Sequence, residues 1–193
     1  MIKRISSKVA CFLCKDEDCQ DSYDLYEYAV YIILSSAFHI ATIIALGLCF
    51  NLLVESIVFY FSFIAIRKFA GGYHAKKSNR CYIISTVSSI IVLVLIKIIL
   101  ICNFKFIEYL LLLLGMFCVI VICYLSPLDT VKNPLNHKEK IVFKIISIVS
   151  SVTIFFMSCL LITFSVFNIG ISMIFGVFMS SLVLALRKAT ENH

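Results

Sequence analysis

One short polar stretch, residues 67–81, holds most of the side chains that could carry out chemistry. It contains Gly71, Gly72, His74, Cys81 and five basic side chains, and it interrupts a very apolar chain. A cysteine thiol becomes nucleophilic when it loses its proton, which requires a nearby base or positively charged surroundings. The imidazole could act as that base, and the lysines and arginines supply positive charge. These residue types therefore suggest nucleophilic catalysis by Cys81 with His74 as general base.

The spacing of His74 and Cys81 sets a condition on the fold of this stretch. On one continuous helix, residues seven positions apart share a face but lie ~10 Å apart along the axis. Proton transfer needs about 3 Å, or one bridging water. The glycine pair breaks the helix and permits a turn that brings the imidazole back toward the thiol. Ser78 or Asn79 is expected to cap the next helix, which places Cys81 in a first turn where the macrodipole favours a thiolate.

A loop without catalytic function would contain the same residue types. Basic residues between membrane spans can serve only to orient a protein in the bilayer. Cysteine and histidine also occur together by chance, and their spacing in catalytic pairs is not fixed across families. The residues alone therefore leave both interpretations of His74 and Cys81 open.

The composition of the chain excludes a water-soluble protein. Hydrophobic residues make up 62% of the 193 positions and charged residues 15%, against about a quarter charged in soluble domains. The mean hydropathy is +1.05. One core of this size cannot bury so much apolar surface, so lipid must be the solvent. We expect an all-α polytopic membrane protein with a single domain over 1–193, whose net charge of +6 faces an anionic membrane leaflet and not a nucleic acid.

Apolar runs long enough to cross a bilayer recur along the chain. We expect six membrane spans, at 29–50, 52–69, 82–101, 106–125, 141–166 and 171–186. A connector around Asn168 and Gly170 is expected to turn the chain between the last two. Residues 1–28 should form a cytoplasmic interfacial segment, because the spacing of residues in 1–14 places an apolar stripe beside a basic stripe on one amphipathic helix.

The distribution of lysine and arginine predicts the orientation of these spans. The segments before the first span and after the second, fourth and sixth contain Lys3, Arg4, Lys8, Lys15, Arg67, Lys68, Lys76, Lys77, Arg80, Lys132, Lys138, Lys140, Lys144, Arg187 and Lys188. The alternate connectors contain only Lys105. The positive-inside rule therefore predicts a cell-membrane protein with both termini in the cytoplasm. His74 and Cys81 then lie on the cytoplasmic side, where thiols stay reduced.

The remaining titratable side chains have less specific interpretations. The nine cysteines are an odd number and several lie in apolar runs, where cysteine acts as a small apolar side chain. Cys11, Cys14 and Cys19 could bind zinc with a nearby carboxylate, but we favour solvated thiols and expect no metal or cofactor. His39, inside the first span, could relay protons or hydrogen-bond to a neighbouring helix. Lys97 is expected to reach the membrane interface from the far end of the third span.

The central stretch closely resembles the motif of a known family. Its order is Arg67, three residues, Gly71, Gly72, one residue and His74, followed by Cys81. This pattern resembles the accessory gene regulator protein B (AgrB) family, which are membrane cysteine endopeptidases of Gram-positive quorum sensing. A second, weaker similarity is the loop 126–135, with Pro127 and Pro134, although it begins Ser-Pro where many relatives have Ala-Pro. Length, hydropathy and the late first span agree, so the resemblance covers nearly the whole chain.

The resemblance implies an enzyme that matures a peptide. Its substrate would be a short precursor with an amphipathic N-terminal helix and an acidic C-terminal tail. Cys81 would attack a backbone carbonyl with His74 as general base, and the tail would leave. The remaining peptide, held as a thioester, would close into a thiolactone or lactone through its own cysteine or serine. The family also implies a homodimer in the lipid bilayer, and small residues such as Ser35, Ser36, Ser180 and Ser181 permit close helix contacts.

Residues near the catalytic pair then become candidates for substrate binding or site structure. The substrate-binding candidates are Arg67, Lys76, Lys77, Arg80, Asp129 and Lys132, and the structural candidates are Gly71, Gly72, Ser78, Asn79, Pro127 and Pro134. The basic loops can attract an acidic tail. Arg67 is the first candidate for a carboxylate contact because its guanidinium is a planar fork, unless it serves only to set topology. Asn79 and Asp129 could each orient His74.

Two other functions are compatible with the residues. A small peptide exporter could line its path with the intramembrane His39 and Lys97. A membrane scaffold could dock a soluble partner on its basic loops through salt-sensitive contacts. A detergent-solubilised sample distinguishes the first of these, because an enzyme cleaves without a sealed bilayer and an exporter does not.

Overall fold

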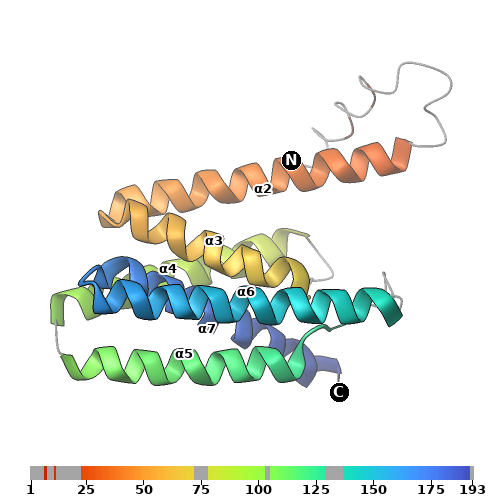
Figure 1. Ribbon diagram of the computed structural model, residues 1–193. Helices are drawn as coiled ribbons and strands as arrows, with labels where there is room; N and C mark the ends of the chain where they lie inside the picture. The colour runs from red at the N-terminus through yellow and green to blue at the C-terminus, as the bar shows by residue number, and fades with distance from the viewer. Residues whose placement is uncertain are drawn as a thin grey trace. The chain divides into compact units, whose positions relative to one another are not determined.

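Long apolar runs fold as helices in this chain because a backbone in lipid must satisfy its hydrogen bonds internally. The computed structural model describes residues 7, 11, 23–71, 78–102, 105–128 and 137–191. These residues form six helices and no strand (Figure 1): α2 (Tyr23–Phe50), α3 (Leu53–Ala70), α4 (Ser78–Cys102), α5 (Lys105–Leu125), α6 (His137–Thr163) and α7 (Phe167–Glu191). Except for residues 7 and 11, the predicted interfacial helix lies outside the described residues, as do Cys14 and Cys19.

Five of the six helices are long and apolar enough to cross a membrane. Their apolar segments are Ala29–Phe50, Tyr82–Cys102, Phe106–Leu125, Lys138–Thr163 and Phe167–Ala189. The exception is α3, which has 18 residues and carries Glu55, Arg67 and Lys68 in its end turns. At 1.5 Å per residue α3 is about 27 Å long, close to the ~30 Å hydrocarbon core. The predicted all-α membrane fold is therefore confirmed.

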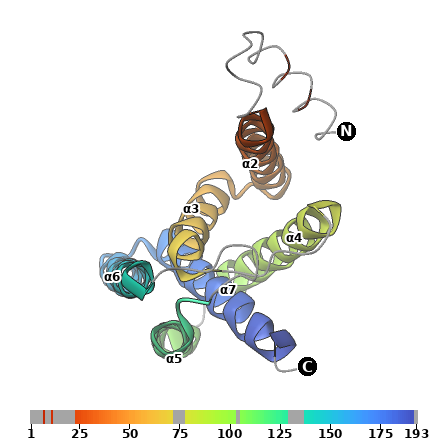
Figure 2. The same cartoon turned by 90° about the vertical axis from the view of Figure 1, so that its right-hand side faces the viewer.

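The chain divides into two compact units, residues 1–45 and 46–193. Within the larger unit, α7 is the central helix and packs against α3, α4, α5 and α6 (Figure 2). Of its apolar segment 61% is buried, compared with 17% to 22% for the segments in α4, α5 and α6. Those three helices therefore present most of their apolar surface outward, as lipid-facing helices do, while α7 forms the protein core.

Small residues let α3 and α7 approach closely. A Cβ on Gly176 would lie 3.1 Å from the Phe59 carbonyl oxygen and 3.1 Å from the Phe63 nitrogen. The hydroxyl of Ser180 lies 2.9 Å from the Gly176 carbonyl oxygen and 3.4 Å from that of Phe63. Ser180 and Ser181 are thus buried within the larger unit, where Ser180 makes the close helix contact expected of such small residues, and the homodimer stays a prediction. Close packing of this kind is how helices associate in lipid, where tails and leucines are equally apolar.

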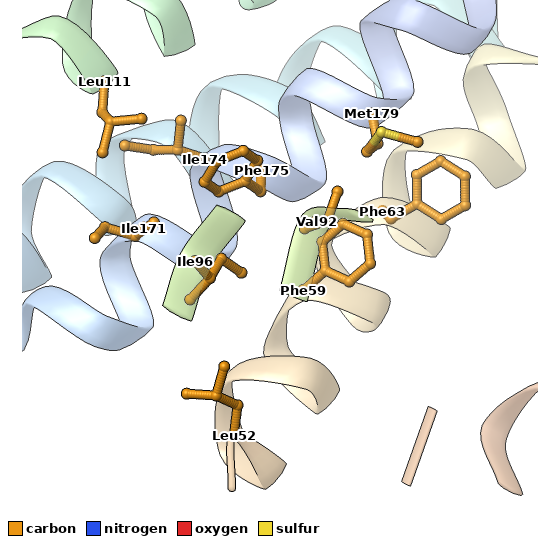
Figure 3. Close-up of a cluster of buried hydrophobic side chains, with 10 residues drawn as sticks. All are labelled: Leu52, Phe59, Phe63, Val92, Ile96, Leu111, Ile171, Ile174, Phe175 and Met179. Carbon is orange, nitrogen blue, oxygen red and sulfur yellow. The ribbon is translucent and has the colours of Figure 1, made fainter. Parts of the chain in front are cut away.

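Two apolar clusters fill the larger unit. The first, drawn in Figure 3, contains Leu52, Phe59, Phe63, Val92, Ile96, Leu111, Ile171, Ile174, Phe175 and Met179. The second contains Ile66, Ala70, Cys118, Ile122, Val177 and Leu184, with Leu128 packed against it. The second cluster therefore joins the C-terminal halves of α3 and α5 to α7, near the position where α3 ends.

The turn between α6 and α7 differs from the prediction. It occupies Phe164–Val166, and the predicted connector around Asn168 and Gly170 lies within the first turn of α7. Ser165 adopts a left-handed conformation with φ 64°, and the Val166 N–H donates to the carbonyl of Leu161 at 2.8 Å. The chain thus reverses direction at a serine, whereas the prediction placed the turn near a glycine.

Gly170 has a packing function. Its N–H donates to the Val166 carbonyl at 3.2 Å, and a Cβ at this position would lie 3.0 Å from the Ser158 carbonyl oxygen in α6. The missing side chain therefore allows close contact between α6 and α7.

The far end of α4 is linked to the end of α2. Nζ of Lys97 donates to the Phe50 carbonyl oxygen at 3.2 Å and lies 5.9 Å from the centroid of the Phe50 ring. Phe50 is the last residue of α2, and a cation at the C-terminus of a helix is favourable because carbonyl groups there lack intrahelical partners. The exposed Lys97 amine therefore caps the C-terminus of α2.

Candidate functional site

Three segments that are distant in sequence meet where α3 ends. These are Ala70 and Gly71 at the end of α3, Ser126–Leu128 after α5, and Arg187 near the end of α7; together we call them the Leu128 junction. The N–H of Leu128 donates to the Ala70 carbonyl at 3.2 Å, and Nη1 of Arg187 donates to the Leu128 carbonyl at 3.5 Å. Figure 1 shows the ends of α3, α5 and α7 at the same side of the larger unit.

Gly71 occupies a conformation and a space that only glycine fits. It follows the last helical residue of α3 with φ 80° and ψ 171°, a region that residues with a side chain essentially do not adopt. A Cβ on Gly71 would also lie 2.7 Å from the Leu128 carbonyl oxygen and 3.3 Å from the Leu128 nitrogen. The prediction that a glycine ends this helix is confirmed, and the close approach of Leu128 adds a second reason for glycine.

The serine that begins the proline loop is held by a buried hydrogen bond. The hydroxyls of Ser126 and Ser147 lie 2.5 Å apart, with exposures of 4% and 0%. Ser147 Oγ also lies within hydrogen-bond distance of the Lys144 carbonyl, 3.0 Å away. When Ser147 gives its single proton to that carbonyl, Ser126 is the donor to Ser147. In either arrangement the bond holds the loop start, where the Ser126–Pro127 peptide is cis, against α6.

Cys81 lies at the start of α4. That helix begins at Ser78, so Cys81 is its fourth residue and falls in the first turn as predicted. The helix starts one or two residues earlier than capping by Ser78 or Asn79 would give. The first four N–H groups of a helix have no intrahelical partner, so this turn carries partial positive charge. The backbone of α4 thus places Cys81 where a thiolate is favoured.

Several predicted site residues lie outside the described part of the chain. These are Gly72, His74, Lys76, Lys77, Asp129, Lys132 and Pro134, together with the side chains of Ser78, Asn79, Arg80 and Cys81. The pairing of His74 with Cys81 and the roles of the basic loop residues therefore stay predictions.

Arg67 lies on the last turn of α3, half-buried. Its guanidinium carbon is 5.4 Å from the centroid of the Phe63 ring, a distance typical of cation–π contact. Beside it, Nζ of Lys68 lies 5.5 Å from the Phe69 ring, which makes an edge contact with Phe143 of α6 at 6.1 Å. Both cations stand at a helix C-terminus, where positive charge is favourable.

Two structural residues of this site, Arg187 and Ser147, were missed by the sequence analysis. Arg187 was interpreted only as a charge that sets topology, yet its side chain is 7% exposed. Ser147 stands within a long apolar helix and has no local motif around it. Neither position carries a signal in a single sequence, because each acts through a contact with a distant segment.

The fold and this junction define a polytopic helical membrane protein. Its two motif segments, the central stretch 67–81 and the loop 126–135, meet at Gly71 and Leu128. The sequence model of the family described as accessory gene regulator B (AgrB) matches residues 5–184, so the chain belongs to that family. The apolar helices and the family together identify a membrane protein.

The similar proteins include AgrB-like proteins from Clostridium. AgrB-like protein 2 of Clostridium perfringens strain 13 is 27% identical over 140 residues, which cover 72% of this chain and 64% of that protein. Accessory gene regulator protein B of Staphylococcus carnosus is 32% identical over 110 residues, 56% of this chain and 55% of the relative. The matched part of the chain thus spans between about half and two thirds of these relatives. No solved structure is significantly similar to the chain.

Proposed function

We propose that this protein is a membrane cysteine endopeptidase that matures a quorum-sensing peptide. It removes the C-terminal tail of a short precursor, holds the remainder as a thioester and releases it as a thiolactone or lactone. Membership of the AgrB family supports this function. The observation that carries the proposal is the contact of Gly71 with Leu128, because it brings the starts of the two motif loops to one point.

Covalent connection keeps the candidate residues near that point. Residues 72–77 follow Gly71 directly and 129–136 follow Leu128. The segment that carries His74 and the segment that carries Asp129 and Lys132 are therefore both attached to the chain at the Leu128 junction.

The chemical steps follow from the residue types. His74 takes the proton of Cys81, and the thiolate attacks the scissile carbonyl carbon of the precursor. The protonated imidazole then gives its proton to the departing amine of the tail, which leaves a thioester on Cys81. A thiol or hydroxyl within the bound peptide gives its proton to the neutral His74 imidazole and attacks that thioester. The ring closes, and Cys81 is released as the thiolate beside the protonated imidazole. No net oxidation occurs.

The first turn of α4 supplies electrostatic stabilisation to these steps. The N–H groups of a helix's first turn lack intrahelical partners, so this turn favours the Cys81 thiolate and can donate to the oxyanion that forms during attack. A site at the membrane boundary with little water also protects the thioester from hydrolysis.

The site faces the cytoplasm in this proposal, with six crossings and both termini inside. The ends of α3 and α7 and the start of α6 lie at the same side of the larger unit as the Leu128 junction (Figure 1), and the described basic residues on them support this orientation. They are Arg67, Lys68, Lys138, Lys140, Lys144, Arg187 and Lys188. Positive charge of this kind marks the cytoplasmic face of a membrane protein. A homodimer in the bilayer is part of the same proposal.

Mutation of the catalytic pair tests the function. Cys81→Ala and His74→Ala should each abolish cleavage of a precursor that has an amphipathic N-terminal helix and an acidic tail, while the protein still accumulates in the membrane. Mass spectrometry of the wild type should detect the precursor fragment attached to Cys81. Cleavage at the normal rate by Cys81→Ala would disprove the assignment.

A peptide exporter without proteolytic activity is the alternative. It would use His39 and Lys97 along its path, but the amine of Lys97 binds the end of α2 at Phe50. Purified protein in detergent distinguishes the two functions, because only the enzyme cuts the precursor without a sealed bilayer.

A further inference from the structure

Arg187 is a buried cation at the end of the central helix. Its side chain is 7% exposed, whereas the neighbouring Lys188 is exposed. A guanidinium keeps its charge in proteins, and a buried charge needs hydrogen-bond acceptors to offset the loss of water. One such acceptor is the Leu128 carbonyl oxygen, 3.5 Å from Nη1.

The Leu128 peptide unit connects the three segments of the junction. Its carbonyl oxygen faces Arg187 and lies against Gly71, where a Cβ would approach it to 2.7 Å. The N–H of Leu128 donates to Ala70, and its side chain packs on the cluster that contains Ile66 and Leu184. The orientation of this one residue therefore relates α7 to the start of both motif loops.

We propose that Arg187 is a positioning residue for the catalytic site. Its guanidinium holds the Leu128 carbonyl, and through Leu128 it sets where the loop that carries His74 leaves α3. This inference rests on the proposed function, but it concerns a residue that belongs to neither motif. Because a positioning residue acts on the site through Leu128 and not on the substrate, loss of Arg187 lowers kcat and leaves KM nearly unchanged.

Kinetics of full-length protein in detergent test this role. The variants are Arg187→Gln, Arg187→Lys and the adjacent control Lys188→Gln, assayed on a synthetic precursor with an acidic tail and normalised to monodisperse protein. Loss of a charged hydrogen bond predicts that Arg187→Gln lowers kcat about tenfold with KM changed less than about twofold. Arg187→Lys keeps a charged donor and should retain more activity, and Lys188→Gln should match the wild type.

A second readout does not depend on cleavage. The rate at which iodoacetamide alkylates Cys81, followed by peptide mass spectrometry, reports the thiolate that His74 helps to form. Arg187→Gln should slow this alkylation, whereas Lys188→Gln should not. If Cys81 of the wild type is alkylated quickly but the protein cleaves no precursor, the proposed function is wrong. The alkylation rates of the variants still test the positioning role in that case.

Two results would overturn the proposal. If Arg187→Gln raises KM and leaves kcat unchanged, Arg187 contacts the substrate. If it behaves like Lys188→Gln in both readouts, the contact with Leu128 has no effect on the site. If Arg187→Gln does not yield folded protein, Arg187→Lys carries the kinetic test, and a change confined to its KM would again contradict a positioning role.

Discussion

The N–H of Leu128 donates a 3.2 Å hydrogen bond to the carbonyl oxygen of Ala70, the last residue of α3. Carbonyl groups at the end of a helix lack intrahelical partners, so the segment after α5 satisfies one of them. The same bond sets the distance between the start of the loop that carries His74 and the start of the proline loop. Changes at this contact should therefore affect both stability and chemistry.

Replacement of Gly71 tests this contact most directly. Gly71→Ala forces a side chain into a conformation with φ 80° and places a Cβ 2.7 Å from the Leu128 carbonyl oxygen. Strain of this kind costs about 1–3 kcal/mol. Thermal unfolding in detergent should show that loss, together with reduced precursor cleavage. Lys68→Ala, an exposed change on the preceding turn, should stay within about 0.5 kcal/mol of the wild type; equal stability of the two variants would contradict the geometry of Gly71.

The sequence was sufficient to predict the helices that depend on local pattern. Apolar runs of bilayer length predicted the helices, the glycine pair predicted the end of α3 before Gly71, and the polar stretch predicted Cys81 in a first turn. Each of these features depends on residues that are neighbours in the chain, so a single sequence carries the signal.

Contacts between helices could not be predicted in this way. In lipid an apolar side chain is equally favourable against a tail or another helix, so hydropathy does not distinguish the central α7 from the outer α4, α5 and α6. For the same reason Gly170 was interpreted as a turn, although it packs against α6 inside the unit. The bond between Leu128 and Ala70 joins positions 58 residues apart and has no local signature.

The buried serine pair predicts an asymmetric response to mutation. Ser147→Ala leaves the buried hydroxyl of Ser126 without its acceptor, which costs about 1–3 kcal/mol. Ser126→Ala costs less, because Ser147 still donates to the Lys144 carbonyl. Unfolding of both variants and of the double variant measures this difference, and the double variant should be more stable than Ser147→Ala alone. The opposite order would show that Ser147 is the donor to Ser126.

Two glycines in the membrane core predict how tightly the helices pack. A Cβ on Gly176 would meet backbone atoms of α3 at 3.1 Å, whereas a Cβ on Gly115 would meet the ring of Phe155, a side chain that can rotate away. Gly176→Ala should therefore lower stability by about 1–3 kcal/mol, the usual cost of overpacking. Gly115→Ala is the matched control and should cost less. Thermal unfolding in one detergent compares them, and a larger loss for Gly115→Ala would contradict the central place of the α3–α7 contact.

The choice between substrate contact and topology charge for Arg67 can be made with one conservative change. Arg67→Lys keeps the charge that orients α3 but removes the planar fork that binds a carboxylate with two hydrogen bonds. If Arg67 binds the acidic tail, KM for the precursor should rise about tenfold, as expected for the loss of one charged hydrogen bond, with little change in kcat. For a precursor whose tail carboxylates are replaced by amides, the wild type and Arg67→Lys should have the same KM.

Lys68→Gln provides the control for Arg67, because Lys68 is the adjacent exposed cation on α3. It removes a full charge from the same end of the helix, and its effect on KM should be smaller than that of Arg67→Lys, because exposed charges are screened by salt. Steady-state kinetics at two salt concentrations separate the general effect of positive charge, which salt screens, from the direct hydrogen bonds between Arg67 and a carboxylate. Wild-type KM in Arg67→Lys would assign Arg67 to topology alone, and the guanidinium would then serve α3 through its contact with the Phe63 ring.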